Sequence, residues 1–392
     1  MKKFNVGLAV VAAMSLYGSA NAQSLAEALT NGKVSGEFTA TYETKDFDKN
    51  VSTYYQGTGY SVGSFALKYE TGAWNNLSLT SKFRAYATLF EEDNDLSTLK
   101  GTGDASERFW EKDNLDRDVD RNADIEELFL TYAPTSNITV KAGRQFISSH
   151  WINKTQDAVK IDAAFGDTSL EAIWSVRQGR IYSRDYRPMT KMNKNKGVYQ
   201  IALSHKFNDN ISATVYDAIA PDKRDIYGAK VNGKIGTVSL GAHYAESKED
   251  KSTGNDDSNL MHFTASTSIA GFSPYAGYIK VDNDAAFPGW AGIAGETIDP
   301  MEEGDYIYKK GAETIYLGVT KSIYDVSATL LYGQTEWDNG TKDVDMNETT
   351  LWLGYPVTKN LKANLGYTVV NMGADTGAED YNQLNFTLAY SF

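Results

Sequence analysis

Two segments of opposite charge contain the residues best suited to bind an ion. The first, residues 91–127, is rich in carboxylates, the hard oxygen ligands that Ca²⁺ prefers. The spacing is not that of an EF-hand loop, so a solvated surface loop is the simpler interpretation and a structural Ca²⁺ site is the alternative. Apart from this Ca²⁺, no cofactor is predicted. The candidate ligands are Asp113, Asp116, Asp118 and Asp120.

The second segment, residues 177–196, is basic and has few acids to oppose it. A charge run of this kind is usually a solvated loop. The alternative is that it forms one side of a passage, where a row of cations guides carboxylates or phosphates. The bases are Arg177, Arg180, Arg184 and Arg187, followed by Lys191, Lys194 and Lys196.

Residues typical of catalysis show no productive pattern. The chain has four histidines and no cysteine. None of the histidines stands in a motif with a nucleophile or at metal-ligand spacing. We therefore expect no enzyme activity, no disulfide and no thiolate metal site. The histidines are His150, His205, His243 and His262.

The N-terminus has the features of an export signal. Lys2 and Lys3 precede an apolar stretch, and the small-residue pattern Ala20-Asn21-Ala22 predicts a signal peptide over residues 1–22. Residues 23–32 follow as a short periplasmic helix, because Ser24 and Glu27 form a capping box. The formal charge is −13, or −15 without the two signal lysines, which argues against nucleic acid as a partner.

From residue 33 onward, apolar and polar residues alternate in segments of about ten residues, as in membrane-spanning strands. Mean hydropathy is −0.43, and nothing after residue 22 approaches the run of about 20 apolar residues that a spanning helix needs. The pattern is clearest at the C-terminus, where one face consists of Leu384, Phe386, Leu388, Tyr390 and Phe392. A soluble β-sandwich also alternates, but aromatic residues gather here towards segment ends, as in interfacial girdles.

The segments predict an all-β fold: a transmembrane antiparallel β-barrel of about 18 strands over residues 33–392, in the bacterial outer membrane. Tight polar turns alternate with longer connections, as periplasmic turns alternate with extracellular loops. The long loops are expected near residues 91–123, 178–195 and 282–310.

Alternation also predicts which charged residues lie on the polar, lumen-facing side of these strands. Arg144 has the opposite parity unless Gly143 marks a bulge, so its direction stays open. The basic candidates on the wall are Lys82, Arg84, Lys141 and Arg177, to which the loop adds Arg180, Arg184 and Arg187. The acidic candidates are Glu37, Glu127, Asp162 and Glu171.

Several motifs of the chain resemble the Opr/OprD-like outer-membrane porins, in particular the major porins of epsilonproteobacteria. They are Ser24-Leu25-Ala26-Glu27-Ala28-Leu29, Asn31-Gly32-Lys33-Val34-Ser35-Gly36, Glu127-Leu128-Phe129-Leu130-Thr131-Tyr132 and Ala142-Gly143-Arg144-Gln145-Phe146. The resemblance implies an 18-stranded, often trimeric barrel in lipopolysaccharide and lipid, with loops folded inward. It also implies that Tyr390 and the terminal Phe392 are read by the barrel-assembly machinery.

The function expected from pattern and resemblance together is a water-filled channel for passive diffusion of ions and small hydrophilic solutes. The third long-side connection, residues 148–154, looks short for a constriction loop. Either a strand boundary is misplaced or other loops narrow the pore. The alternatives are a barrel transporter for specific hydrophobic or carboxylate substrates, and an adhesin or envelope-structural barrel.

Overall fold

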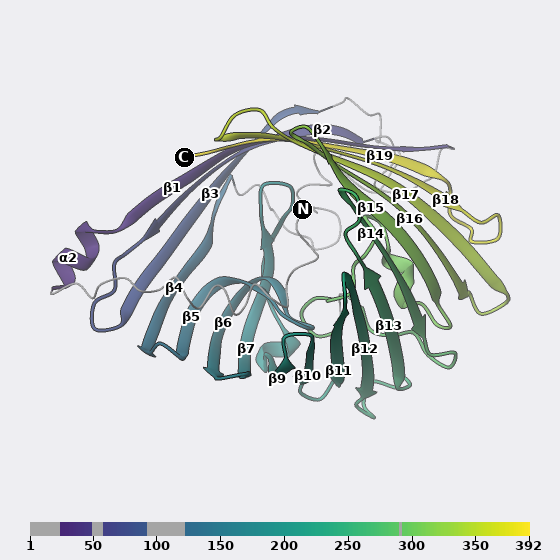
Figure 1. Cartoon of the computed structure of the whole chain (residues 1–392), viewed down its shortest axis with the longest axis horizontal. Coiled ribbons are helices and arrows are strands. Elements are labelled where there is room, and N and C mark those ends of the chain that lie inside the picture. The colour runs from purple at the N-terminus through teal and green to yellow at the C-terminus, as the bar shows by residue number, and fades with distance from the viewer. Residues whose placement is uncertain (1–23, 49–57, 92–121, 290–291) are drawn as a thin grey trace.

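The computed structural model describes residues 24–48, 58–91, 122–289 and 292–392. Its strands form one antiparallel sheet, and because β1 pairs with both β2 and β19, the sheet closes into an 18-stranded barrel (Figure 1). One further strand, β8, lies outside the closed wall, and among the described strands it pairs with the end of β7 alone. The expected barrel is confirmed. The signal-peptide prediction lies outside the described residues.

The elements have the following bounds. The first strands are β1 Lys33–Phe47, β2 Thr58–Glu70, β3 Leu77–Glu91, β4 Ala123–Thr135, β5 Ile138–Ser148, β6 Asn153–Phe165, β7 Thr168–Ile181, β8 Tyr186–Lys191, β9 Val198–Asn208 and β10 Ile211–Ala220. They continue with β11 Arg224–Ile235, β12 Val238–Glu249, β13 Ser258–Ser266, β14 Phe272–Val281, β15 Glu313–Ile323, β16 Val326–Asp338, β17 Asp343–Pro356, β18 Leu361–Met372 and β19 Tyr381–Ser391. The helical segments are α2 Leu25–Thr30, η3 Asn193–Asn195 and η4 Asp305–Tyr308.

Each wall strand has two faces because side chains alternate along it. In β1 the exposed Val34 and Phe38 point outward, whereas Thr39, Thr41 and Glu43 are buried on the inside. This is the arrangement of a barrel with an apolar outer surface and a polar lumen. Among the described residues, no helix is long and apolar enough to cross a membrane.

The short helix α2 caps the end of the barrel where the tight turns lie. The Ser24 hydroxyl accepts a hydrogen bond from the Glu27 amide at 3.1 Å, as the capping pattern predicts. The helix is tied to the β2–β3 turn because the Gly72 amide donates to the Ala28 carbonyl at 2.9 Å. Tight turns mark the periplasmic end of such barrels, so the long connections lie at the extracellular end.

The seam between the first and last strands is closed down to the final residue. The Gly36 amide donates to the Phe392 carbonyl at 3.0 Å, and the Phe392 amide donates back to the Gly36 carbonyl at 3.1 Å. The ring of Phe392 covers Gly36 so closely that a Cβ there would lie 2.2 Å from a ring carbon. Phe392 therefore completes the pairing of β19 with β1.

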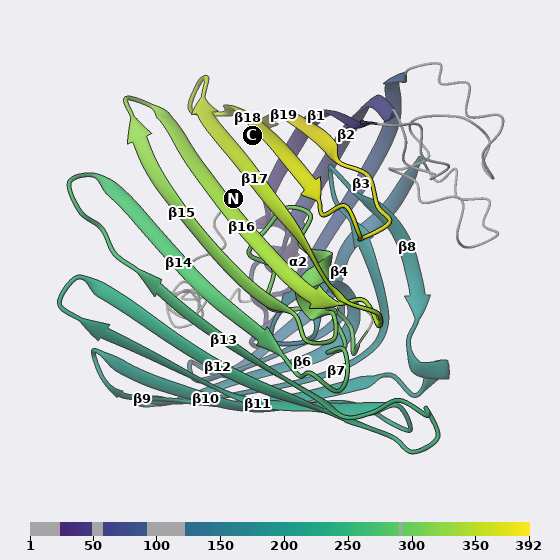
Figure 2. The ribbon, with the colours of Figure 1, turned by 90° about the vertical axis from the view of Figure 1, so that its right-hand side faces the viewer.

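The segment predicted as a loop at residues 178–195 is more regular than expected. β7 extends to Ile181 and turns back into β8, so the two form a hairpin that we call the inner hairpin, residues 178–191. In Figure 1 it rises from the β7 wall across the interior, and Figure 2 shows β8 at the same end of the barrel as the top of β3. The hairpin therefore folds over the extracellular mouth.

We predict that replacing Phe392 by Asp lowers the amount of assembled barrel, because the seam loses its terminal aromatic contact and places a charge at the lipid surface. Folded protein is measured by the heat-dependent gel shift of purified outer membranes. Phe90→Asp, which changes an exposed aromatic residue at the other end of a strand, is the matched control. Normal surface levels of the Phe392 variant would remove the case for an assembly signal.

Candidate functional site: the lumen and its constriction

The charged side chains on the lumen wall of β1–β4 pair with one another. Arg84 is only 2% exposed and donates to Glu126 at 2.8 Å, Glu37 at 3.0 Å and Ser64 at 2.8 Å. Lys82 pairs with the other oxygen of Glu126 at 2.7 Å. A buried guanidinium requires such partners because an unpaired buried charge is costly. Two basic candidates and one acidic candidate from the sequence thus belong to one network.

Glu126 joins this network through a β-bulge. Lys82 pairs in register with Glu127, but Phe83 pairs with Ile125, so Glu126 is an extra residue in β4. The consecutive carboxylates of Glu126 and Glu127 therefore both lie on the inner face of β4, where strict alternation would place only one of them. Glu127 lies 3.9 Å from Lys68. Alternation along the strand predicts Glu127 on the inner face but not Glu126, because a bulge leaves no signal in the alternation.

A second group of charges lies on β5–β7. Lys160 pairs with Asp162 and, at 2.9 Å, with Glu171, which also accepts hydrogen bonds from Ser149 and Gln200. Lys141 lies opposite Lys160 in the register. Its amine is 5.4 Å from the centre of the Phe129 ring and has no carboxylate partner among the described residues.

Arg177 lies on the outer face, contrary to the prediction. Val176 is a bulge residue, because Asp157 pairs in register with Arg177 whereas Ala158 pairs with Ser175. The neighbouring Gln178 points inward and donates to the Ala294 carbonyl at 2.9 Å, so Arg177 points outward. Its guanidinium is 4.0 Å from Asp157.

Arg144, whose direction the sequence leaves open, pairs with Asp157 at 2.8 Å and with Asp124 at 3.1 Å. Gly143 precedes it with a φ of +130°, a conformation that residues other than glycine rarely adopt. Gly143 lies in the middle of β5, and Arg144 beside it reaches across to Asp124 near the start of β4.

The inner hairpin is held against the opposite wall by buried aromatic and aliphatic contacts. Ile181 and Tyr186, both 0% exposed, cluster with Tyr60, Val62 and Tyr86 of β2 and β3. The rings of Tyr86 and Tyr186 are 5.3 Å apart in an edge-on arrangement, and the Tyr186 hydroxyl donates to Asp124 at 3.1 Å. The hairpin is therefore a fixed part of the lumen.

The arginines of the inner hairpin differ in their surroundings. Arg180 pairs with Asp185 of the same hairpin at 2.7 Å, and Arg187 lies opposite Arg180 in the register. Arg184 is at the turn and lies 3.7 Å from Glu43 of β1 and 3.5 Å from Glu302. Arg184 thus links the turn of the hairpin to β1 and to residue 302.

A long loop crosses the lumen and meets the inner hairpin. We call residues 282–312, between β14 and β15, the crossing loop. One part is bound to the short connection 149–152 and to β6, since the Ala294 amide donates to the Trp151 carbonyl at 3.0 Å and the Asn153 amide donates to the Ala294 carbonyl at 3.1 Å. The connection 149–152 thus supports the crossing loop, which lies across the lumen as the inner hairpin does.

We call residues 301–303 of the crossing loop its tip. The tip carries two carboxylates to the side of the lumen formed by β1 and β19. Glu303 pairs with Lys45 of β1 at 2.9 Å and accepts a hydrogen bond from the Tyr381 hydroxyl at 3.1 Å. Glu302 is the partner of Arg184. We define the constriction as Glu43, Lys45, Arg184, Glu302 and Glu303, which come from three segments distant in sequence.

His150 of the connection 149–152 and His243 near the middle of β12 are packing residues. The Tyr216 hydroxyl lies 2.6 Å from the His243 ring nitrogen and accepts from the Trp151 indole at 3.1 Å, while the His150 ring stacks on Tyr216. No nucleophile joins them within the described residues. The arrangement holds the short connection 149–152 against the wall.

Two further features bear on binding. The acidic candidates Asp113, Asp116, Asp118 and Asp120 lie outside the described residues. Within the described residues, no group of three or more His, Asp or Glu could hold a metal ion.

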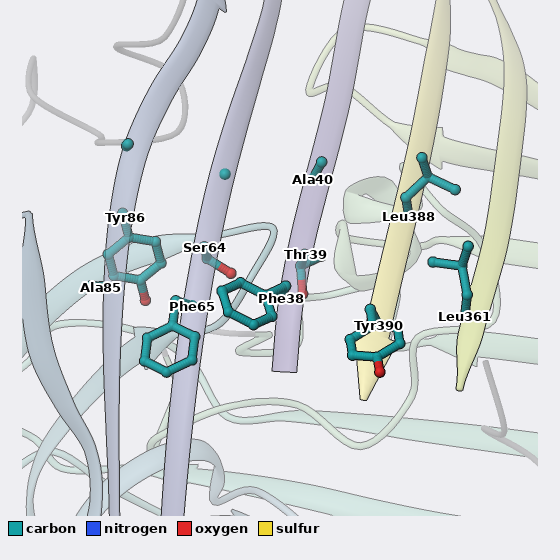
Figure 3. A pocket seen from close by; sticks show the side chains of 12 residues that line it. Phe38, Thr39, Ala40, Ser64, Phe65, Ala85, Tyr86, Leu361, Leu388 and Tyr390 are labelled. Atoms are coloured by element: carbon teal, nitrogen blue, oxygen red, sulfur yellow. The ribbon is translucent and has the colours of Figure 1, made fainter. Parts of the chain in front are cut away.

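On the outer face, a groove of about 480 Å³ crosses the seam between β19 and β1, where Ala40, Gly63 and Ala85 leave room beside larger side chains (Figure 3). Its apolar lining suits lipid rather than a polar solute.

Comparison with known proteins agrees with this architecture. The chain resembles the crystal structures of Pseudomonas aeruginosa OccK3 (OpdO), with a TM-score of 0.72 and 16% identity over 94% of this chain and 98% of that chain. It also resembles P. aeruginosa OpdK with vanillate, with a TM-score of 0.71 and 15% identity over 93% and 99%. The crystal structure of Acinetobacter baumannii OccAB1 is similar with a TM-score of 0.72 and 12% identity, over 95% of this chain and 99% of that chain. No curated protein matches the chain.

The sequence identities to these structures are low, so they show the likeness of fold alone. A family model described as Gram-negative porin matches residues 7–375, nearly the whole chain. A closed barrel with an apolar exterior, a charged lumen and inward-folded segments is what such a protein requires. The chain belongs to the Gram-negative porin family and forms an outer-membrane channel for small solutes.

Proposed function

We propose that this porin passes small hydrophilic ions and solutes with weak charge selectivity, and that the constriction sets that selectivity. The observation that carries the proposal is the contact of Arg184 with Glu43 and Glu302. At this point a solute meets both signs of charge within a few ångströms. Opposite charges that are already paired create little net field to favour one ion over another.

The lumen wall supports the same interpretation. Arg84, Lys82 and Lys160 each lie against carboxylates, so the basic candidates do not form an open row of cations. We also propose that the chain has no enzyme activity, because its buried histidines serve packing and its family members are channels. Family membership does not favour the transporter or adhesin alternatives.

We further propose that the chain forms a homotrimer, is folded by the barrel-assembly machinery and is surrounded by lipopolysaccharide. These partners rest on the resemblance to epsilonproteobacterial porins. The exposed aromatic residues of the outer face, such as Phe165 and Phe207, are suited to the interfacial zone of such a membrane.

The function is tested by reconstituting the purified protein in planar bilayers. We expect discrete conductance steps with a linear current–voltage relation, because the channel is a fixed aqueous path. At high voltage each step should close in three equal parts if three barrels insert together. Absence of conductance from folded protein would contradict the channel function, and closure in a single part would contradict the trimer.

We predict that Arg184→Gln shifts the reversal potential under a salt gradient toward cation selectivity by several millivolts, because the substitution removes the positive charge beside Glu43 and Glu302. The shift should shrink in 1 M salt, where the Debye length is about 3 Å. Arg177→Gln on the outer face is the matched control and should have no effect. An unchanged potential in the Arg184 variant, or an equal shift in both, would place selectivity elsewhere in the channel.

A further inference from the structure

We propose that Glu348 of β17 and Gly333 of β16 form a receptor on the barrel wall for the tip of the crossing loop, and that this receptor sets the aperture of the pore. The two residues are direct cross-strand partners. They contact loop residues Met301–Glu303. The inference rests on the channel function and identifies the residues that position its constriction.

The carboxylate of Glu348 binds the main chain of the loop. One oxygen accepts a hydrogen bond from the Glu302 amide at 2.8 Å, and the other accepts from the Glu303 amide at 2.9 Å. The Thr350 hydroxyl adds a third bond at 2.8 Å. Two adjacent amides thus match the two oxygens of one carboxyl group, and both oxygens of Glu348 are bonded to the loop.

Glu348 is buried on the inner face of β17, where its carboxylate needs hydrogen-bond partners. It is 0% exposed and lies in the inner row of β17 with Val344, Met346 and Thr350. A carboxylate buried in such a row is costly unless it is hydrogen-bonded. Here the loop amides supply the bonds, so the loop and the carboxylate stabilise each other.

Gly333 provides the space beside this carboxylate. A Cβ at Gly333 would lie 2.2 Å from the Met301 sulfur, so the absence of a side chain forms the notch that Met301 fills. Met301 is itself only 2% exposed. The loop tip is therefore fixed by an apolar anchor at Met301 and by two main-chain hydrogen bonds immediately after it.

This attachment leaves the side chains of the tip directed into the lumen. Because Glu348 holds the amides of Glu302 and Glu303, their carboxylates turn to Arg184 and Lys45. The loop is held independently at Ala294 on the opposite wall. Loss of the receptor should thus free the tip while the rest of the loop stays attached, which widens the constriction.

The test compares single-channel conductance of Glu348→Ala, Glu348→Gln and Gly333→Leu with the unaltered protein. We expect Glu348→Ala to raise conductance on the order of twofold, because the loop tip leaves the narrowest section. Gly333→Leu should do the same by expelling Met301. The conductance of Glu348→Gln should lie between those of the unaltered protein and Glu348→Ala, because its single carbonyl oxygen can replace only part of the acceptor pair. Thr349→Val, whose side chain is on the other face of β17, is the matched control.

A second measurement follows the loop tip itself. The chain has no cysteine, so a single Met301→Cys is a unique site for a water-soluble thiol reagent. Its labelling rate in folded protein should rise at least severalfold when Glu348 is replaced by Ala, and stay unchanged with Thr349→Val. Folding of each variant is checked by its heat-dependent gel shift.

Unaltered conductance and labelling in a folded Glu348→Ala barrel would overturn the proposal, as would an equal effect of Thr349→Val. If the unaltered protein does not conduct, the channel function itself fails, and this outcome is distinct from both. If Glu348→Ala does not assemble, Gly333→Leu and Glu348→Gln decide, since both keep the strand pairing intact.

Discussion

The structure depends on a single requirement of the membrane: every backbone N–H and C=O within the hydrocarbon must find a partner in the protein. An open sheet would leave two unpaired edges, and the pairing of β1 with β19 removes both. The reciprocal hydrogen bonds between Gly36 and Phe392 extend that pairing to the last residue. All other features of the channel are arranged on the wall that this seam closes.

Closure separates an apolar exterior from a polar interior, and the interior is then partly filled by the inner hairpin and the crossing loop. Charges on the wall lose water as these segments cover them, so they require partners. Arg84, held by Glu126 and Glu37, is the clearest case. Removing one partner of such a buried pair typically costs about 3–5 kcal/mol, so these networks also fix the wall.

Much of the barrel could be predicted from the sequence, because the alternation that defines a membrane strand is a local property. The helix at Leu25–Thr30 was equally predictable, since its cap lies within four residues. Alternation fails where the strand is irregular. The bulge at Val176 turns Arg177 outward, and the bulge at Glu126 adds an acid that parity does not count.

The constriction could be predicted only in part. Arg184 was a candidate because its segment is basic, but its partners Glu43 and Glu302 lie far away in the sequence and have no local signal. Nor does any pattern show that the loop after β14 folds inward to reach Glu348, since that path depends on a buried carboxylate and a glycine on distant strands. Long-range contacts of this kind depend on the closed barrel.

The inner hairpin and the crossing loop fill part of the lumen near its extracellular mouth, so we expect the channel to be narrower there than below. Adding neutral polymers of graded size to one side of the bilayer at a time measures this most directly. Polymers of intermediate size should lower conductance when added on the periplasmic side, where they enter the lumen, and have little effect from the extracellular side, where the constriction excludes them. Equal effects from both sides at every polymer size would contradict the account, because they would show a channel of uniform width.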